Sequence, residues 1–203
     1  MTRLINKKHL AVIGAAVLLG LQGCVPLVFV GGAAVGVLVG TDPRPAETMK
    51  GDLDLGGKIS ATIIDTWKDQ AHVNVNTFNS NILLTGEVPD EAARARVQQI
   101  AQSQTGVRHV YNETVVAPLS STTDRLNDTQ LTTRVKASII GQGGDTSGFH
   151  LMVVTERKVV YLMGIAKPDV ANQSAQAASL VSGVEQVVKL VEFQPQGPAD
   201  RAN

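Results

Sequence analysis

The sequence contains an internal repeat, and this feature restricts the possible folds more than any other. Three segments of the first half recur, in the same order, in the second half. The pairs are residues 59–64 (ISATII) with 135–140 (VKASII), 73–86 (VNVNTFNSNILLTG) with 151–164 (LMVVTERKVVYLMG), and 105–116 (TGVRHVYNETVV) with 182–193 (SGVEQVVKLVEF). The shifts are 76, 78 and 77 residues, measured from Ile59 to Val135, Gly86 to Gly164 and Gly106 to Gly183. A nearly constant shift indicates two copies of one folding unit.

Each copy has the pattern helix, strand, strand, helix, strand. The first helix of each copy carries apolar residues at intervals of four, which place them on one helix face. These residues are Leu55, Ile59, Ile63 and Trp67 in the first copy, and Leu131, Val135 and Ile139 in the second. Alternating apolar residues then predict a hairpin in each copy, which ends at Gly86 or Gly164. In the second copy we also expect Asn127 or Asp128 to cap the first helix. The predicted class is α+β, each copy being a sandwich of two helices on a three-stranded sheet, about 70 residues long.

The N-terminus has the features of a secretion signal. Arg3, Lys7 and Lys8 give it a positive start, and residues 10–21 form an apolar run of the length found in signal peptides. Cys24 follows this run and is the only cysteine of the chain. Because it has no internal partner for a disulfide, Cys24 pairs with another chain, stays free or is modified.

Two other interpretations of this segment compete with a signal. One is a transmembrane helix, because no charged residue occurs between Lys8 and Asp42 and a span needs about 20 apolar residues. Pro26 and several glycines interrupt the part after Cys24, however, so residues 25–40 fit an apolar tether better than a span. The other interpretation is an ordinary buried cysteine in a membrane anchor.

Several motifs together resemble a known family. Residues 21–24 (LQGC) are similar to a bacterial lipobox, at which the chain is cut before the cysteine and fatty acyl chains are attached to it. The order of elements, with Gly-Val before the last strand, resembles BON domains, and two copies behind a lipobox resemble outer-membrane lipoproteins of that family. Residues 110–113 (VYNE), 132–135 (TTRV) and 163–164 (MG) also match. The resemblance covers residues 18–193. It implies a palmitate-bearing lipoprotein on the periplasmic face of a Gram-negative outer membrane, supporting envelope integrity, the stress response and cell division.

The boundaries follow from the prolines and polar stretches between the repeated segments. The expected organisation is a signal peptide (1–23), lipidated Cys24 with an apolar tether (24–46), a first BON domain (47–118), a linker (119–127), a second BON domain (128–193) and a disordered tail (194–203).

Composition argues against several functions. The chain has 18 basic and 18 acidic residues, and loss of the signal removes three of the basic ones. A slightly acidic protein with 3% aromatic residues has neither the basic field nor the stacking platforms of a nucleic-acid binder. The histidines, which are His9, His72, His109 and His150, lack the spacing of metal ligands. We find no nucleophile with a base and no phosphate loop, and we therefore expect no enzyme, no cofactor, no metal and no nucleic-acid partner.

The first helix of the second copy is the predicted working surface. Residues 129–140 include Arg134 and Lys136 and no acidic residue, and Ile140 shares a side with Lys136. Basic residues beside an exposed apolar one suit an anionic lipid surface. By resemblance to the family, this helix binds anionic phospholipid such as phosphatidylglycerol or cardiolipin. The contacts carried over by position are Gln130, Leu131, Arg134, Lys136 and Ile140. The family member compared has Trp where this chain has Gln130, which removes an interfacial anchor.

Two alternatives stay open. In the first, the anchor only localises the chain, and the domains dock on a protein partner such as an outer-membrane assembly factor or a cell-wall protein. In the second, the chain is a stress protein with chaperone-like surfaces, an interpretation that has no need for lipidation of Cys24.

Overall fold

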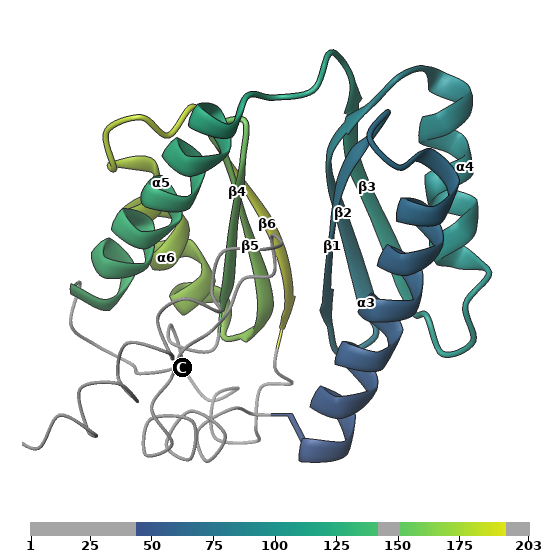
Figure 1. The fold of residues 1–203 in the computed structure, drawn as a ribbon. Coiled ribbons are helices and arrows are strands. Elements are labelled where there is room, and N and C mark those ends of the chain that lie inside the picture. The colour runs from purple at the N-terminus through teal and green to yellow at the C-terminus, as the bar shows by residue number, and fades with distance from the viewer. Residues whose placement is uncertain (1–43, 142–150, 194–203) are drawn as a thin grey trace, which may run out of the picture. The chain divides into compact units, whose positions relative to one another are not determined.

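The computed structural model describes residues 44–141 and 151–193. The first copy contains α3 (Ala46–Trp67), β1 (His72–Phe78), β2 (Asn81–Val88), α4 (Glu91–Gln102) and β3 (His109–Val116). The second copy contains α5 (Thr122–Gly141), β4 (Met152–Glu156), β5 (Val159–Ala166), α6 (Pro168–Ser179) and β6 (Gln186–Phe193) (Figure 1). The repeat and the α+β class are therefore confirmed, whereas the predicted signal, tether and tail lie outside the described residues.

The two sheets have the same topology. In the first sheet the order is β1-β2-β3, with β1 and β2 antiparallel and β2 and β3 parallel; β4-β5-β6 repeats this arrangement. A parallel neighbour needs a crossover connection, which α4 provides in the first copy and α6 in the second. The helices of each copy lie together on one side of its sheet (Figure 1).

The predicted apolar stripes are the cores of the two copies. Ile59 and Ile63 on α3, and Val135 on α5, have almost no exposed surface. They pack against inward-facing strand residues such as Leu84 and Leu162. The four-residue spacing therefore identified the buried helix faces correctly, and Trp67 also packs at the edge of the first core.

Helix α5 begins earlier than expected. Ser121 and Asp124 stabilise its first turn through reciprocal hydrogen bonds. The Asp124 amide donates to Ser121 Oγ (3.1 Å). In return, the amide (3.2 Å) and the hydroxyl (2.6 Å) of Ser121 donate to Asp124 Oδ2. This reciprocal cap satisfies amides that a helix start leaves unpaired. The prediction that Asn127 or Asp128 caps the helix is therefore wrong, and residues 122–127 of the expected linker are helical.

Asp128 instead holds the hairpin turn of its own domain. Its buried carboxylate accepts hydrogen bonds from the amides of Arg157 (2.8 Å) and Lys158 (3.0 Å). These two residues have φ of 50° and 63°, values in the left-handed region that Asn and Gly adopt more readily than Arg or Lys. The charged acceptor compensates for this unfavourable backbone conformation. Arg157 and Lys158 thus form a turn.

The first copy repeats this device. Asp52 on α3 accepts from the amides of Asn79 (2.7 Å) and Ser80 (2.8 Å), which also have φ of 50° and 63°. A helix-to-turn clamp by a buried aspartate is therefore part of the repeated unit, although neither aspartate belongs to the apolar pattern.

Both faces of β2 are buried. Ile82 and Leu84 face the helices of their own domain, while the alternate residues Leu83 and Glu87 point to the opposite face and are also fully buried. The glycines that were expected to end the hairpins, Gly86 and Gly164, lie within β2 and β5 instead.

The second domain covers this opposite face. Phe78 and Leu83 of the first sheet form one apolar cluster with Tyr161 and Met163 of the second. Hydrogen bonds cross at its edge: Arg108 Nη1 donates to Glu192 (3.0 Å), and Asn81 Nδ2 also donates to this carboxylate. The sheets therefore pack on each other through their outer faces, and we call this contact the seam.

We expect Asp128→Ala to lower the free energy of unfolding by about 3 kcal/mol, because two amides lose a charged acceptor inside the fold. Asn127→Ala, at the exposed neighbouring position, should change it by less than about 0.5 kcal/mol. Urea unfolding followed by circular dichroism measures both. Equal stability of the two variants would show that the clamp contributes nothing.

Gly86→Ala should destabilise the first domain by about 3 kcal/mol or more. Gly86 has φ of +110°, and a Cβ there would lie 2.0 Å from the carbonyl oxygen of His72. Gly57→Ala on α3, where a Cβ meets nothing within 4 Å, should instead stabilise the helix by about 0.5–1 kcal/mol. Thermal unfolding of both variants tests the contrast, and a Gly86→Ala protein as stable as the Gly57→Ala protein would contradict it.

Candidate functional site

Four of the five predicted lipid contacts lie on the solvent side of α5. Gln130, Arg134 and Lys136 are exposed, and Ile140 has 51% of its surface exposed. With 100° per residue, Arg134 and Lys136 lie on opposite flanks of this side, and Gln130 and Ile140 lie between them. The structure thus presents these four residues together on one helix surface.

Leu131 is a correction. Its side chain is 3% exposed and packs in the core with Val135 and Ile139. The residue belongs to the apolar stripe that attaches α5 to its sheet, so it supports the helix and cannot contact a membrane. The expectation that Leu131 binds lipid is therefore wrong.

Two exposed leucines near this surface were not predicted. Leu126 lies on α5 one turn before Gln130 and is exposed. Leu180, 74% exposed, follows α6. Arg134 Nη1 donates to the carbonyl of Ser182 (3.0 Å), which brings the loop after α6 to the side of α5. Leu126 could have been found from helical periodicity, but only the tertiary fold brings Leu180 near. We call Leu126, Gln130, Arg134, Lys136, Ile140 and Leu180 the α5 surface.

Helix α3 is the internal counterpart of α5 and differs in charge. It also exposes two large apolar residues, Leu53 and Ile64. Each is followed directly by an exposed acidic residue, Asp54 or Asp65. An anionic lipid surface repels these carboxylates, whereas between residues 129 and 140 the charged residues of α5 are both basic. The two corresponding helices therefore differ in the charge that lies next to their exposed apolar residues.

The proposed lipidation residue, Cys24, lies outside the described residues. Among the helices of residues 44–141 and 151–193, none is long and apolar enough to span a bilayer.

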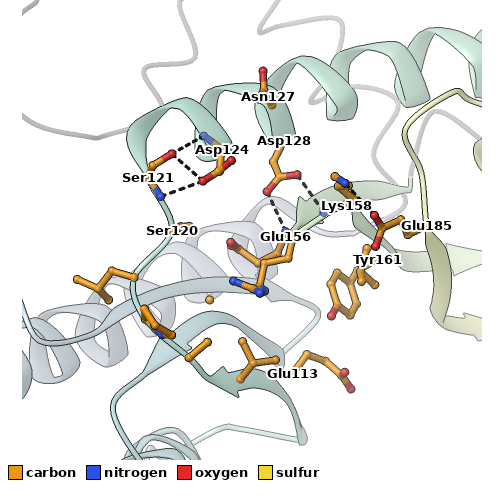
Figure 2. A pocket seen from close by; sticks show the side chains of 17 residues that line it. Glu113, Ser120, Ser121, Asp124, Asn127, Asp128, Glu156, Lys158, Tyr161 and Glu185 are labelled. Atoms are coloured by element: carbon orange, nitrogen blue, oxygen red, sulfur yellow. Dashed lines mark hydrogen bonds and ion pairs between the residues drawn. The ribbon is translucent and has the colours of Figure 1, made fainter.

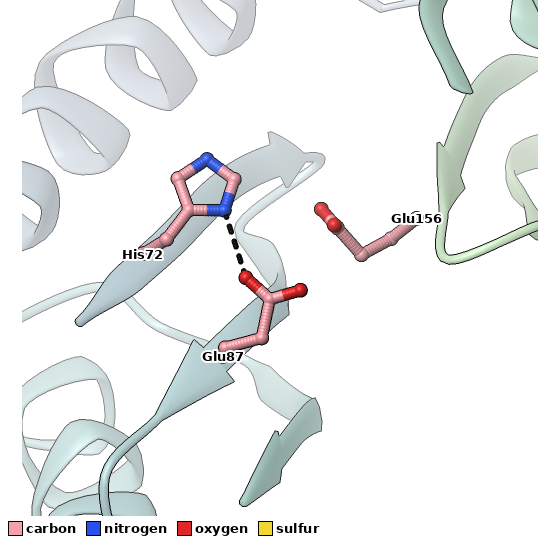
Figure 3. Close-up of side chains that lie close together, drawn as sticks. All are labelled: His72, Glu87 and Glu156. Carbon is pink, nitrogen blue, oxygen red and sulfur yellow. Dashed lines mark hydrogen bonds and ion pairs between the residues drawn. The ribbon is translucent and has the colours of Figure 1, made fainter. Parts of the chain in front are cut away.

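A second group of residues meets at the seam and was not anticipated from the sequence. His72 and Glu87 come from the first sheet and Glu156 from the second, and one potential ligand atom of each lies within 4.8 Å of the others (Figure 3). The exposed fractions of Glu87 and Glu156 are 0% and 6%. No sequence motif joins these residues, because only the packing of the domains brings Glu156 to the other two.

Hydrogen bonds orient the two carboxylates of this group. Glu87 Oε2 accepts from Ser120 Oγ (3.2 Å) and lies 3.3 Å from His72 Nδ1. Glu156 Oε2 accepts from Asn74 Nδ2 (2.8 Å) and Thr85 Oγ1 (3.4 Å) across the seam.

Burial changes the protonation of two members. It raises the pKa of Glu156, an effect that the Asn74 hydrogen bond opposes and the nearby charges of Glu87 and Asp128 reinforce. Burial, and then the charge of Arg125, lower the pKa of His72, while Glu87 raises it. The lowered pKa favours a neutral imidazole, whose free nitrogen can bind a cation.

An open pocket of about 750 Å³ adjoins this group. Acidic residues dominate its charged lining, which consists of Glu113, Asp124, Asp128, Glu156 and Glu185 with Arg157 and Lys158 (Figure 2). Lys158 pairs with Glu185 (2.8 Å), and Arg157 Nη1 lies 3.4 Å from Glu87. Burial, with the charges of Glu113 and Glu156, raises the pKa of Tyr161 to about 12, so its hydroxyl stays protonated and no phenolate is available there at neutral pH.

Comparison with known proteins identifies both repeated units. The BON domain model matches residues 51–118 and 127–195. A relative described as "Outer membrane lipoprotein DolP", from Haemophilus influenzae, is 34% identical over 189 residues, which is 92% of this chain and 96% of the relative. A protein described as "21 kDa hemolysin", from Actinobacillus pleuropneumoniae, is 27% identical over 154 residues, which is 75% of this chain and 79% of that protein.

Among solved structures, one of CdsD, described as a structural protein of the type III secretion system of Chlamydia trachomatis, is 13% identical. The match covers 73% of this chain and 96% of that chain with a TM-score of 0.31.

Proposed function

This chain belongs to the BON-domain family, and from that premise we propose that it binds anionic phospholipid through the α5 surface. It is an outer-membrane lipoprotein with two BON domains, as its relative across nearly the whole chain is. In our proposal acyl chains on Cys24 hold it at the periplasmic face, and α5 contacts lipid headgroups. We infer a binding role in maintaining the envelope rather than a catalytic one.

The observation that carries this proposal is the composition of the α5 surface. Arg134 and Lys136 flank a strip that contains exposed Leu126 and Ile140. Each basic residue near an anionic surface contributes about 1 kcal/mol, so two give only weak binding. A lipid anchor makes this second contact intramolecular and so raises its effective concentration.

Gln130 lies in the middle of this strip, where an aromatic anchor would insert most effectively. Its amide gives little apolar area, so we expect weaker membrane binding than a Trp would give at this place. Leu126 and Leu180 supply part of the missing area, since both are large, apolar and exposed. The α5 surface thus combines two basic side chains with apolar side chains that lie at separate positions, without a single large aromatic anchor.

A second candidate function is docking of a protein partner, and one observation favours it. A groove of about 490 Å³ lies beside α3, lined by Met49, Leu53, Val75 and Met152 among others. Its apolar lining suits a side chain of a partner such as an outer-membrane assembly protein. Pull-down from detergent extracts with and without Leu53→Asp separates this function from lipid binding.

Reversing both charges of α5 (Arg134→Glu with Lys136→Glu) should weaken binding to phosphatidylglycerol vesicles by about 30-fold or more, because about 2 kcal/mol of attraction is lost. The matched control reverses Lys50 and Lys58, which are equally exposed but lie on α3. We would measure co-sedimentation of residues 41–203, without the anchor, with anionic and neutral vesicles at two salt concentrations.

Undiminished binding of the α5 double variant, with an unchanged circular dichroism spectrum, would refute the proposed surface. An equal loss in the α3 control would show that net charge alone governs binding. Absence of binding by the wild-type fragment would instead favour the protein-partner function.

Gln130→Trp should strengthen binding to the same vesicles by about tenfold, since a large apolar side chain buried at an interface contributes about 1.5 kcal/mol or more. Ala95→Trp, at an exposed position of α4, is the control and should have little effect. If both tryptophans increase binding equally, α5 is not oriented toward the lipid.

A further inference from the structure

We propose that His72, Glu87 and Glu156 form a zinc-binding site at the seam between the two domains. The group offers one imidazole nitrogen and two carboxylates, with their ligand atoms within 4.8 Å of one another. Catalytic and structural zinc sites use such nitrogen and oxygen donors, whereas magnesium and calcium prefer oxygen alone. The donor set therefore favours zinc among divalent cations.

The spacing of two ligands already suits an ion. His72 Nδ1 and Glu87 Oε2 are 3.3 Å apart, about the distance between two ligands that each lie ~2.1 Å from a tetrahedral ion. Zinc bound to Nδ1 would replace the proton that this nitrogen donates to Glu87, and the proton would pass to solvent. Glu156 approaches them from the other sheet (Figure 3). The donor atom of Glu156 lies within 4.8 Å of the other two, and a water molecule would be the fourth ligand of a tetrahedral ion.

The surroundings resemble the outer shell of a metal site. Asn74 and Thr85 donate to Glu156, and Ser120 donates to Glu87. Such hydrogen bonds orient ligand carboxylates and increase metal affinity. Three residues of the first domain and its linker thus orient carboxylates that a purely apolar seam would not contain.

Two cationic side chains lie near this group: Arg125, which donates from Nε to Ser120 Oγ (3.0 Å), and Arg157. Arg157 Nη1 lies 3.4 Å from Glu87 Oε1, not from the oxygen that faces His72. The Arg157 side chain is about half exposed and lines the open pocket, so it can move toward solvent. The guanidinium therefore neutralises part of the site without occupying the space between the three ligands.

The pocket provides the entry path for the ion. Glu156 belongs to its lining, together with four further carboxylates and only two cationic side chains. A cleft with an excess of negative charge concentrates cations. The acidic lining of the pocket is an observation separate from the spacing of the three side chains, and it also favours binding of a cation.

Zinc would join the two domains. Two ligands belong to the first sheet and one to the second, so the bound ion adds a link across the seam. An ion that binds only the folded protein stabilises it by RT ln(1 + [L]/Kd), where [L] is the free ion concentration. Zinc should therefore raise the temperature at which half of the protein is unfolded. The site is separate from the α5 surface, and its test does not depend on lipid binding.

The experiment uses the full chain, purified in detergent without a histidine tag. Titration with ZnCl₂ against a chromogenic chelator should give one zinc ion per chain, and CoCl₂ should give the intense visible bands of a tetrahedral site. Glu156→Gln and His72→Gln should each lower zinc affinity by about tenfold or more, since each removes a direct ligand. The matched controls are Glu113→Gln, which lines the pocket, and His109→Gln; both should bind as the wild type does.

Several outcomes would overturn the proposal. These are absence of stoichiometric zinc binding, equal affinity in the ligand and control variants, and a loss of binding in His109→Gln as large as in His72→Gln. Glu156→Gln keeps an acceptor for Asn74, and circular dichroism identifies any variant that fails to fold. Because the two ligand variants lie in different domains, folding failure of one leaves the other as a complete test.

Discussion

The packing of one sheet on the other is the interaction on which the rest of the structure depends. A three-stranded sheet with helices on one side leaves its second side exposed, and a domain of about 70 residues is marginally stable by itself. Leu83 and Tyr161 remove these second sides from water by packing in a shared cluster. Burial of apolar area, about 25 cal/mol per Å², therefore stabilises both domains at once.

This arrangement also determines which surfaces are left for function. Because the sheets face each other, the helices are the elements that remain at the outside, and their outward residues meet solvent or a membrane. Arg134 and Ile140 are available on α5 for this reason. The same packing buries polar groups at the seam, where Glu87 and Glu156 need hydrogen-bond or cation partners, because an unpaired buried charge is costly.

The candidate sites differ in how far the sequence could predict them. The charge pattern of α5 is local, so Gln130 and Lys136 could be assigned to an exposed face from helical periodicity. The resemblance to the family places Leu131 among the lipid contacts, but its position on the apolar stripe places its side chain in the core. The clamp by Asp128 and the seam group of Glu156 could not be predicted, since their partners are distant in sequence and carry no periodic signal.

The two-copy organisation, the order of elements in each copy and the helix faces that form the cores follow from the amino-acid sequence alone. These properties depend on interactions between residues a few positions apart. The same local pattern occurs in both copies, which makes the prediction more secure. Long-range packing was needed to show that the outer faces of the sheets are buried, that the loop after α6 lies beside α5, and that His72 lies close to Glu156. Alternation along a strand marks two faces, but which of them is covered depends on what packs against it.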